Sequence, residues 1–459
     1  MKVFLAVFIC KILYFLGKCV GKGSSLPGKV VLKIFPDVLG QLSLPETIIA
    51  VTGSNGKTSV TEIIVHALKS TGRTVAWNHE GSNQTEGVAT VLLRSASFGG
   101  KVKSEAVVME CDERYAKNIF TKVKPTVLLV TNLCRDQLTR NGHPEFVEDC
   151  LRAAIGVLGD EVQLVLNADD PYVSALAYQQ SHESGQLCRE NRPPGTVLWF
   201  GVKNPGGITQ KPGMYDDGAF CPVCKARMSY SYRVAGHYGD YSCSSCGLKR
   251  NKADVEAIYH GDQGESSHGS VSFNDDVSLS MKQPSITGAY NFCAAVAVCK
   301  AVGINISDSA KLLDGYELTG GRTVRLKIGE RDGLLLISKH ENSFAYDCSL
   351  SWITGQKKQC TVIVLVDSIS RKYYTSETSW LWDIDFDLLS DECVKNVVLA
   401  GRYVNELAAR FDMSGVLQDR IGYVADLSGL RKYIEENTVG EVYVVTCFSD
   451  KKKLLKVIK

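Results

Sequence analysis

The stretch Thr47-Ile-Ile-Ala-Val-Thr-Gly-Ser-Asn-Gly-Lys-Thr58 decides the fold, because an apolar run leads into a glycine-rich turn that ends in Lys-Thr. The residues after it carry apolar side chains at helical spacing: Val60, Ile63, Ile64, Ala67 and Leu68. Strand, glycine-rich turn and helix is an order that holds phosphates, since backbone N–H groups and the helix start point at the phosphate oxygens. The stretch therefore predicts the first strand and helix of an α/β domain that binds ATP.

The residues of this loop have separate expected roles. We predict that Lys57 neutralises the β- and γ-phosphates and that Thr58 holds Mg²⁺. The residues expected to wrap the phosphates are Gly53, Asn55 and Gly56. The first glycine of the usual phosphate loop would fall at Val51, so this is not the standard form, and an ordinary glycine-rich turn is the alternative.

The composition narrows the class of protein. A chain of 459 residues is long enough for two or three domains at about 150 residues each. Charged residues make up 22% and the net charge is +2, so the overall charge gives no reason to expect a nucleic-acid partner. Sixteen cysteines in a long nucleotide-binding chain do not predict a disulfide framework, and we expect a cytoplasmic protein.

Residues 1–45 form an N-terminal segment with its own character. The first 20 residues are apolar enough to suggest a signal peptide or a membrane span, but Lys2, Lys11 and Lys18 interrupt them, and no small-residue cleavage site follows. An amphipathic helix fits this pattern better. We expect it to pack on the ATP-binding domain or to rest on the inner face of the membrane.

Further along the chain, β-like runs alternate with helical ones, which is typical of a mostly parallel sheet flanked by helices. The expected strands after Thr47 to Val51 are TVAW, EAVVME, TVLLVTN and VQLVLN, and a helix is expected over 291–302. Four further strands, LLLIS, CTVIVLVD, NVVLAG and EVYVVT, lie beyond a hinge-like segment at 320–322. We therefore predict an α/β protein with a central ATP-binding domain over 46–319 and a C-terminal α/β domain over 320–459.

Between about residues 218 and 251 the sequence becomes polar and rich in cysteine, as in an inserted module. Two Cys-x-x-Cys pairs stand eighteen residues apart, Cys221 with Cys224 and Cys243 with Cys246. This spacing predicts a zinc ribbon, in which four thiolates surround a structural Zn²⁺ and leave no open position for catalysis. Four unrelated buried cysteines are the alternative.

Polar groups follow three of the predicted strands, at the edge where ligands bind in parallel sheets. Glu110, Asp112 and Glu113 follow the third strand, where a carboxylate can reach the Mg²⁺ of the phosphate loop. Glu110 is the best candidate, because it lies nearest the strand end. Thr131-Asn132 and the run 167–171 follow the next two strands, and the second of these, taken alone, is typical of a turn.

Taken in order, the motifs TGSNGKT, ECDE, TNL, LNADDP, GAYNFCAA (288–295) and GR (321–322) resemble those of the Mur ligases, which activate a carboxylate with ATP and join it to an amine. Within that superfamily the chain resembles the MurT family, the ligase subunits of lipid II isoglutaminyl synthase, from about residue 25 onward. The four-cysteine ribbon, TNLCRDQLTR (131–140) and SWLWDIDF (379–386) carry this likeness. Three stretches depart from the pattern: Gln137 stands where many Mur ligases have His, His340 to Asn342 follow Lys339, and 366–380 is longer with fewer acids.

The resemblance implies a fold and site residues. It implies a Mur ligase-type ATPase domain with an inserted zinc ribbon, in which Lys57 holds phosphates and Thr58 and Glu110 hold Mg²⁺. The further residues that it implies at the nucleotide are Asn167, Asp169 and Asp170 near the base and ribose, Asn291 at the start of a helix, and Arg322 from the hinge.

The resemblance also implies a two-subunit enzyme. ATP would phosphorylate the α-carboxyl of D-glutamate in the stem peptide of lipid II, at the membrane surface, and ammonia would attack the acyl phosphate to give D-isoglutamine. Nothing here looks like a glutaminase, so a GatD-like glutaminase subunit is the implied partner. Asp367 could orient the histidine of its Cys-His pair, with Asp383 as the fallback and a strand-end turn as the alternative.

Two other functions stay open at this point. One is a Mur or folylpolyglutamate-type ligase that adds an amino acid instead of ammonia. The other is a catalytically weak scaffold that binds ATP and docks a partner.

Overall fold

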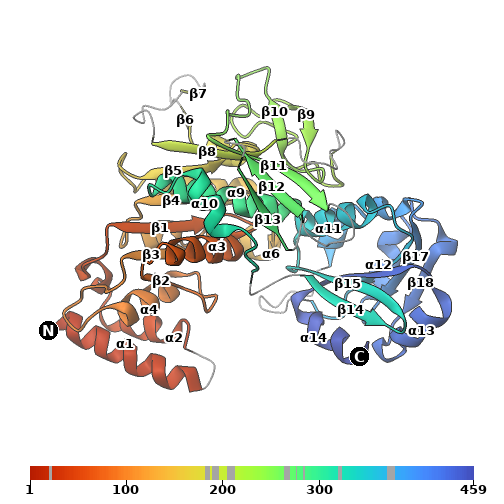
Figure 1. Cartoon of the computed structure of the whole chain (residues 1–459), viewed down its shortest axis with the longest axis horizontal. Coiled ribbons are helices and arrows are strands. Elements are labelled where there is room, and N and C mark those ends of the chain that lie inside the picture. The colour runs from red at the N-terminus through yellow and green to blue at the C-terminus, as the bar shows by residue number, and fades with distance from the viewer. Residues whose placement is uncertain are drawn as a thin grey trace.

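A nine-stranded sheet organises the chain before residue 282 (Figure 1). The computed structural model describes residues 1–19, 23–180, 187–188, 196–203, 212–262, 269–274, 277–282, 285–318, 323–369 and 378–458. The strands lie in the order β13-β12-β11-β8-β5-β4-β1-β3-β2. Their bounds are β1 Thr47–Thr52, β2 Val75–Trp77, β3 Ala106–Glu110, β4 Val127–Val130, β5 Gln163–Asn167, β8 Val197–Val202, β11 Val255–Asp262, β12 Gly269–Phe273 and β13 Ser278–Met281.

All neighbours from β2 to β11 pair in parallel, and β12 and β13 complete the sheet as antiparallel strands. The five strands expected before residue 168 are all present, and β1, β3 and β4 are buried almost throughout because helices cover both faces. The α/β fold class is confirmed.

Helices cover the two faces of this sheet. On one face lie α3 (Lys57–Ser70), α9 (Ile286–Ala301) and α10 (Ile306–Leu313). On the other face lie α1 (Lys2–Cys19), α2 (Leu26–Ile34), α4 (Thr85–Ser95), α5 (Ala116–Phe120), α7 (Pro144–Ile155) and α8 (Pro171–Ala175). The apolar residues predicted on one side of α3 are all buried against the sheet, which shows that their spacing fixes how this helix sits.

The helix expected to begin at Asn291 begins five residues earlier. Ser285 caps it, and its hydroxyl oxygen accepts a 3.0 Å hydrogen bond from the N–H of Gly288. The prediction of the start was wrong because Gly288 interrupts the apolar pattern, whereas the serine cap fixes the first turn in spite of it. Asn291 therefore lies in the second turn of α9.

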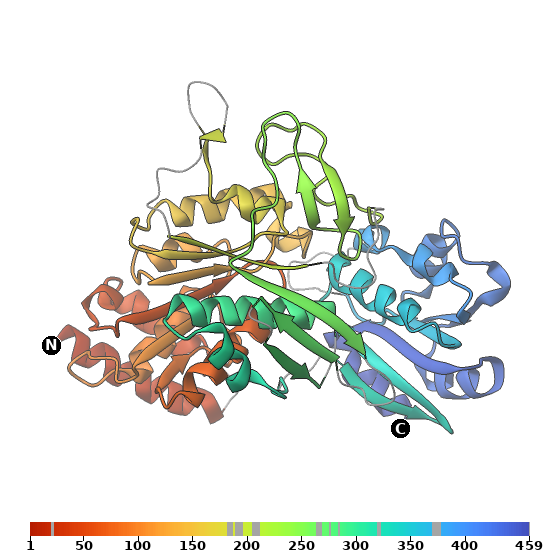
Figure 2. The same cartoon turned by 45° about the horizontal axis from the view of Figure 1, so that its top comes forward.

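A small two-stranded sheet, β9 (Ser229–Arg233) with β10 (Gly239–Ser242), lies in the cysteine-rich region. Figure 2 shows this hairpin projecting from the central sheet on the side of the C-terminal domain. His237, at the turn of this hairpin, connects the hairpin to the C-terminal domain. Its Nδ1 lies 2.6 Å from a carboxylate oxygen of Asp217, and its Nε2 lies 2.9 Å from a carboxylate oxygen of Asp347 in the C-terminal domain. The short strands β6 (Gln179–Gln180) and β7 (Leu187–Cys188) form another pair.

A second sheet organises the chain from residue 323 onward, in the order β14-β15-β19-β16-β17-β18. Its strands are β14 Thr323–Ile328, β15 Arg331–Ser338, β16 Cys360–Leu365, β17 Val394–Ala400, β18 Ile421–Val424 and β19 Glu441–Cys447. Only the β14–β15 pair is antiparallel. The helices on its two faces are α11 (Ser343–Gly355) and α12 (Val404–Phe411) on one, and α13 (Leu430–Asn437) and α14 (Phe448–Val457) on the other.

Candidate active site

The loop between β1 and α3 needs its two glycines for steric reasons. Gly53 and Gly56 have φ of +121° and +83°, a region that side chains rarely adopt. A Cβ on Gly53 would lie 2.3 Å from Oγ1 of Thr131, and one on Gly56 would lie 2.4 Å from Oδ1 of Asn291. The second contact places Asn291 of α9 directly against the loop, although the two are far apart in sequence.

Lys57 begins α3 and points back over the loop. Its ammonium group donates to the carbonyl oxygen of Gly53 and lies 2.5 Å from a carboxylate oxygen of Glu113. Burial lowers the pKa of Lys57, but Glu113, Glu110 and Asp136 together raise it above its ordinary value. The side chain is therefore a fixed positive charge at the place where a phosphate would lie.

Thr58 and Glu110 form the expected cation pair. The Thr58 hydroxyl donates a 2.8 Å hydrogen bond to one Glu110 carboxylate oxygen, and Asn83 Nδ2 donates to the other at 3.1 Å. Asn78 holds the backbone of Glu110 through hydrogen bonds of 2.8 and 2.9 Å. A cavity of about 110 Å³ opens here between Lys57 and Lys339. Adjacent hydroxyl and carboxylate oxygens beside open space fit the oxygen preference of Mg²⁺.

Side chains from the C-terminal domain reach the same loop. Lys339, after β15, donates a 2.9 Å hydrogen bond to the carbonyl oxygen of Ser54 and lies 3.5 Å from Asp136. The Asn342 amide, at the start of α11, donates to Asn55 Oδ1 at 2.9 Å and to Asp136 Oδ1 at 2.7 Å. From the sequence, Lys339 and Asn342 stood out only as part of a departure from the family pattern, and Asp136 did not stand out as a site residue. The available signal was a lysine directly after a buried strand of the second domain.

The phosphate loop also contains a side-chain hydrogen-bond donor that is available to a ligand. Asn55 Nδ2 is buried and has no hydrogen-bond partner within the described part of the chain. Its backbone N–H donates at 2.9 Å to Oδ1 of Asn132, so the residue itself is held in place. A buried amide donor without a partner is costly unless a ligand accepts from it, which fits phosphate oxygens.

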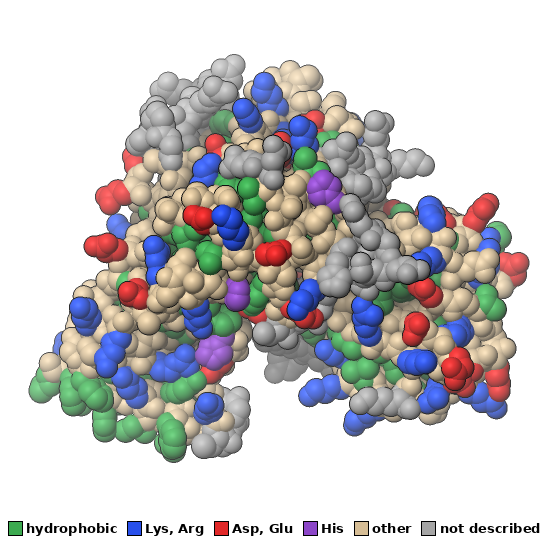
Figure 3. All heavy atoms as spheres, viewed as in Figure 1, with side chains coloured by type: hydrophobic (Ala, Val, Ile, Leu, Met, Phe, Trp, Pro, Cys, Tyr) green, Lys and Arg blue, Asp and Glu red, His purple; other side chains and the backbone are tan. Residues whose placement is uncertain are grey.

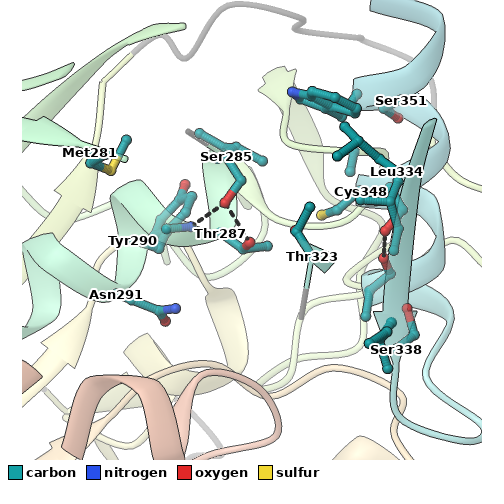
Figure 4. Close-up of a pocket in the computed structure, with 18 of the residues that line it drawn as sticks. Met281, Ser285, Thr287, Tyr290, Asn291, Thr323, Leu334, Ser338, Cys348 and Ser351 are labelled. Atoms are coloured by element: carbon teal, nitrogen blue, oxygen red, sulfur yellow. Dashed lines mark hydrogen bonds between the residues drawn. The ribbon is translucent and has the colours of Figure 1, made fainter. Parts of the chain in front are cut away.

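A cavity of about 790 Å³ lies beside the loop, between the two domains. Figure 4 shows Tyr290 and Asn291 of α9 on one side and Leu334, Cys348 and Ser351 of the C-terminal domain on the other. This volume is within the range of small-molecule sites, and one wall is the loop itself. A nucleotide whose phosphates lie on the loop has room here for its base and ribose.

Asn167, Asp169 and Asp170 are fully buried and bond within the protein. Asn167 Nδ2 donates to the carbonyl oxygen of Thr131 at 2.9 Å, and Asp170 accepts from three backbone N–H groups, one of them Leu133 at 2.6 Å. Asp169 accepts from Arg250 Nε and from the Tyr290 hydroxyl, both at 2.6 Å. None of the three lines either described cavity, so their place near base and ribose stays a prediction. Arg322 lies outside the described residues.

The four cysteines predicted to bind zinc lie together. Their sulfur atoms are all within 4.8 Å of one another, with Cys221 and Cys246 at 3.5 Å and Cys224 and Cys243 at 3.5 Å. A tetrahedron with Zn–S bonds of about 2.3 Å has sulfur atoms about 3.8 Å apart, so this cluster is the right size for Zn²⁺. The geometry fits a closed, structural site.

Asp367 and Asp383 lie on the C-terminal domain, and each takes part in an ion pair. Asp367 follows β16, and its carboxylate accepts from the backbone N–H of Arg402 at 3.0 Å and pairs with Lys453. Burial would raise the pKa of Asp367, but Lys453 and Arg402 hold it below the ordinary value. Asp383 instead pairs with Arg135 of the central domain at 2.7 Å. The roles proposed for both carboxylates stay predictions.

Two family models match the chain. The Mur ligase middle domain matches residues 51–189, and the MurT ligase C-terminal domain matches residues 340–450. The first range contains the phosphate loop and Glu110, and the second contains Asn342 and begins directly after Lys339.

The chain is similar to curated MurT subunits along most of its length. The chain is 27% identical over 418 residues to the MurT subunit of lipid II isoglutaminyl synthase (glutamine-hydrolysing) from Staphylococcus aureus strain N315, covering 91% of this chain and 89% of that protein. It is 27% identical to the subunit of that name from Streptococcus pneumoniae strain R6, covering 94% and 91%.

Among solved structures, a pseudomurein peptide ligase type C from Methanothermus fervidus matches with a TM-score of 0.68 at 19% identity, over 92% of this chain and 81% of that one. MurF ligase from Thermotoga maritima in complex with ADP matches with a TM-score of 0.57 at 17% identity, over 94% and 83%.

Proposed function

Since this chain is a MurT homologue built as a Mur ligase, an ATP-dependent ligase of peptidoglycan synthesis, we propose that it amidates the α-carboxyl of D-glutamate in the stem peptide of lipid II. ATP phosphorylates the carboxylate, and ammonia then displaces phosphate to leave D-isoglutamine. The observation that carries this proposal is the contact of Lys339 and Asn342 with the phosphate loop, because it brings the MurT-type C-terminal domain to the loop on which the phosphates of ATP would lie.

The charges around the loop suit phosphoryl transfer. Lys57 and Lys339 place two ammonium groups near the loop, and each of them balances negative charge that develops as the phosphoryl group moves. When Mg²⁺ is bound, Thr58 and Glu110 would hold it, and it would supply further charge neutralisation. The Asn55 amide is a spare donor for phosphate oxygens.

The second half-reaction needs unprotonated ammonia, which is scarce in neutral water. A glutaminase partner, GatD-like in its chemistry, would release ammonia within a sheltered complex. Asp367 is the group we assign to orient the histidine of that partner, because its carboxylate is ionised, partly exposed and fixed by Arg402 and Lys453 at the end of a central strand. Asp383 is the less favoured candidate, since it does not lie at the end of a strand and its carboxylate pairs with Arg135 of the central domain.

The proposal is tested by turnover of the purified chain. We expect ADP release that depends on a stem peptide with a free D-glutamate α-carboxyl and on ammonium salt, and an amidated peptide by mass spectrometry. Lys339→Met should lower this rate about a hundredfold or more, as loss of one charge-stabilising contact does. Lys327→Met, an exposed lysine on β14 of the same sheet, is the matched control and should retain the rate.

Other outcomes would overturn the assignment in distinct ways. Product formation with an amino acid and none with ammonium would make the chain an amino acid-adding ligase. ATP binding with no turnover on any stem peptide would make it a scaffold.

A further inference from the structure

Helix α1 exposes a continuous apolar face. Met1, Phe4, Leu5, Phe8, Ile12, Phe15 and Leu16 are each at least 40% exposed, and Phe15 reaches 71%. They recur every three or four residues, so they share one side of the helix. Phe98, 47% exposed, extends the face, with its ring 5.3 Å from that of Phe4. We call these eight residues the α1 face.

The opposite side of α1 holds the helix on the protein. Ala6, Val7 and Cys10 are fully buried and belong to the core cluster beneath α1. Gly28 of α2 lies so close to α4 that an added Cβ would lie 2.0 Å from the carbonyl oxygen of Glu86. The buried side therefore holds α1 on the protein, and the α1 face points outward.

An apolar area of this extent is unusual on a protein surface unless something binds it. Figure 3 shows hydrophobic side chains with basic side chains among them over the N-terminal helices, at the lower left of the view. The exposure of these side chains is not explained by a poorly packed helix, because the opposite side of α1 is buried in the core.

The charge around the α1 face indicates what covers it. The first 36 residues contain six lysines and no acidic residue, in a chain whose net charge is only +2. Lys2, Lys18, Lys29 and Lys33 are exposed on α1 and α2. Lys11 lies with its Nζ 5.0 Å from the centre of the Phe98 ring, at the edge of the apolar area. Apolar side chains bordered by lysines complement acyl chains bordered by phosphate headgroups.

We propose that the α1 face docks this protein on an anionic phospholipid surface, with the helix lying in the plane of the interface. No helix within the described residues is long and apolar enough to cross a membrane. Insertion of one face accounts for the apolar side chains without a span. The inference rests on the proposed function in one respect: a lipid-linked substrate makes a membrane-docked enzyme useful.

Vesicle flotation with the full-length chain tests the proposal. We expect the wild-type protein to float with phosphatidylglycerol-containing vesicles and much less with pure phosphatidylcholine vesicles. Phe15→Ser with Leu16→Ser should lower the bound fraction about tenfold or more, because two large side chains no longer leave water. Met413→Ser with Leu417→Ser is the matched control, since these residues are also 71% and 57% exposed and lie far away in the sequence.

A charge variant separates the two parts of the proposal. Lys18→Glu with Lys29→Glu should abolish the preference for anionic vesicles, while the exposed pair Lys327→Glu with Lys395→Glu should leave it nearly unchanged.

Equal flotation of wild type and the Phe15/Leu16 variant would overturn the proposal. So would a concentration-dependent dimer that the same variant abolishes, since a second copy would then cover the face. Turnover on a water-soluble stem peptide should be unchanged in these variants. Loss of vesicle binding with intact turnover would leave the ligase assignment standing, and vesicle binding without any turnover would leave only the docking surface.

Discussion

His237 gives the sharpest test of how the domains are held together. Its ring is 1% exposed and lies between two carboxylates, Asp217 at 2.6 Å and Asp347 at 2.9 Å. A neutral imidazole has one N–H and can donate to only one of them, whereas the imidazolium donates to both. Burial alone would lower the pKa of His237, but the hydrogen bonds that its ring donates to the two carboxylates raise it to about 9.

The sign of the pH effect follows from that shift. An unfolded histidine has a pKa of about 6.5. The folded pKa is higher, so the stabilisation is fully present below about pH 6.5 and is lost as the pH rises through about 9. At about 1.4 kcal/mol per pKa unit, the interval from about 6.5 to about 9 corresponds to about 3 kcal/mol.

His237→Gln should remove this pH dependence and destabilise the protein at pH 6.5 by about 3 kcal/mol or more, because two buried carboxylates lose their cation. Urea titration followed by tryptophan fluorescence reports on both domains, since Trp77 and Trp199 lie in the central domain and Trp352, Trp380 and Trp382 in the C-terminal domain. We expect the wild-type midpoint to fall between pH 6.5 and 9.5 and the midpoint of the variant to stay level.

His260→Gln, at an exposed site on β11, should behave as the wild type does. Adding Asp347→Asn to His237→Gln should recover part of the loss, because one uncompensated charge is removed. Equal midpoint changes with pH in the wild type and in His237→Gln would refute the reasoning.

Three further substitutions probe the separate sites. Lys57→Ala should lower ATP-dependent turnover about a hundredfold or more while the exposed Lys69→Ala on the same helix has no effect, and wild-type-like turnover in Lys57→Ala would remove the phosphate-loop assignment. Cys221→Ser should yield protein without stoichiometric zinc by elemental analysis, whereas Cys150→Ser retains it; a wild-type protein that lacks zinc after gentle purification would contradict the ribbon. Asp367→Asn should lower glutamine-dependent amidation in the two-subunit complex, with recovery on added ammonium salt, and unchanged glutamine use would discard its role.

Much of the fold could be predicted from the sequence, because the signal for a strand or for a metal site lies within a few neighbouring residues. The apolar runs of β1, β3, β4 and β5 are buried on both faces, so each carries its own signal. Zinc ligation also depends on short spacings, and the four cysteines lie together as predicted. Several strands were not predicted, β8, β11, β14 and β18 among them. Two others, β12 and β13, have alternating buried and exposed positions over only four or five residues. Such a pattern is too short to distinguish from a loop.

Contacts between distant segments could not be predicted in this way. Lys339 and Asn342 meet the phosphate loop only because the second domain packs against the first. The one local signal, a lysine directly after a buried strand, does not tell which distant loop that lysine meets. The run at 167–170 shows a different limit, because its place in the fold was predicted but its contacts were not. The end of a strand fixes the edge of the sheet at which a residue lies, and it does not fix the direction in which the side chain points. Asp169 instead turns inward to Arg250 and Tyr290.

The bond between Asn55 and Asn342 has a thermodynamic consequence. Asn55 belongs to the phosphate loop, yet its amide oxygen accepts from the second domain. The N–H of Gln137 also donates to the carbonyl oxygen of Glu341 across the same boundary, at 2.8 Å. These hydrogen bonds connect the conformation of the loop to the orientation of the second domain. By reciprocity, whatever free energy a phosphate ligand gains from the assembled loop it also adds to the cost of separating the domains, so product release and domain opening are favoured by the same substitutions.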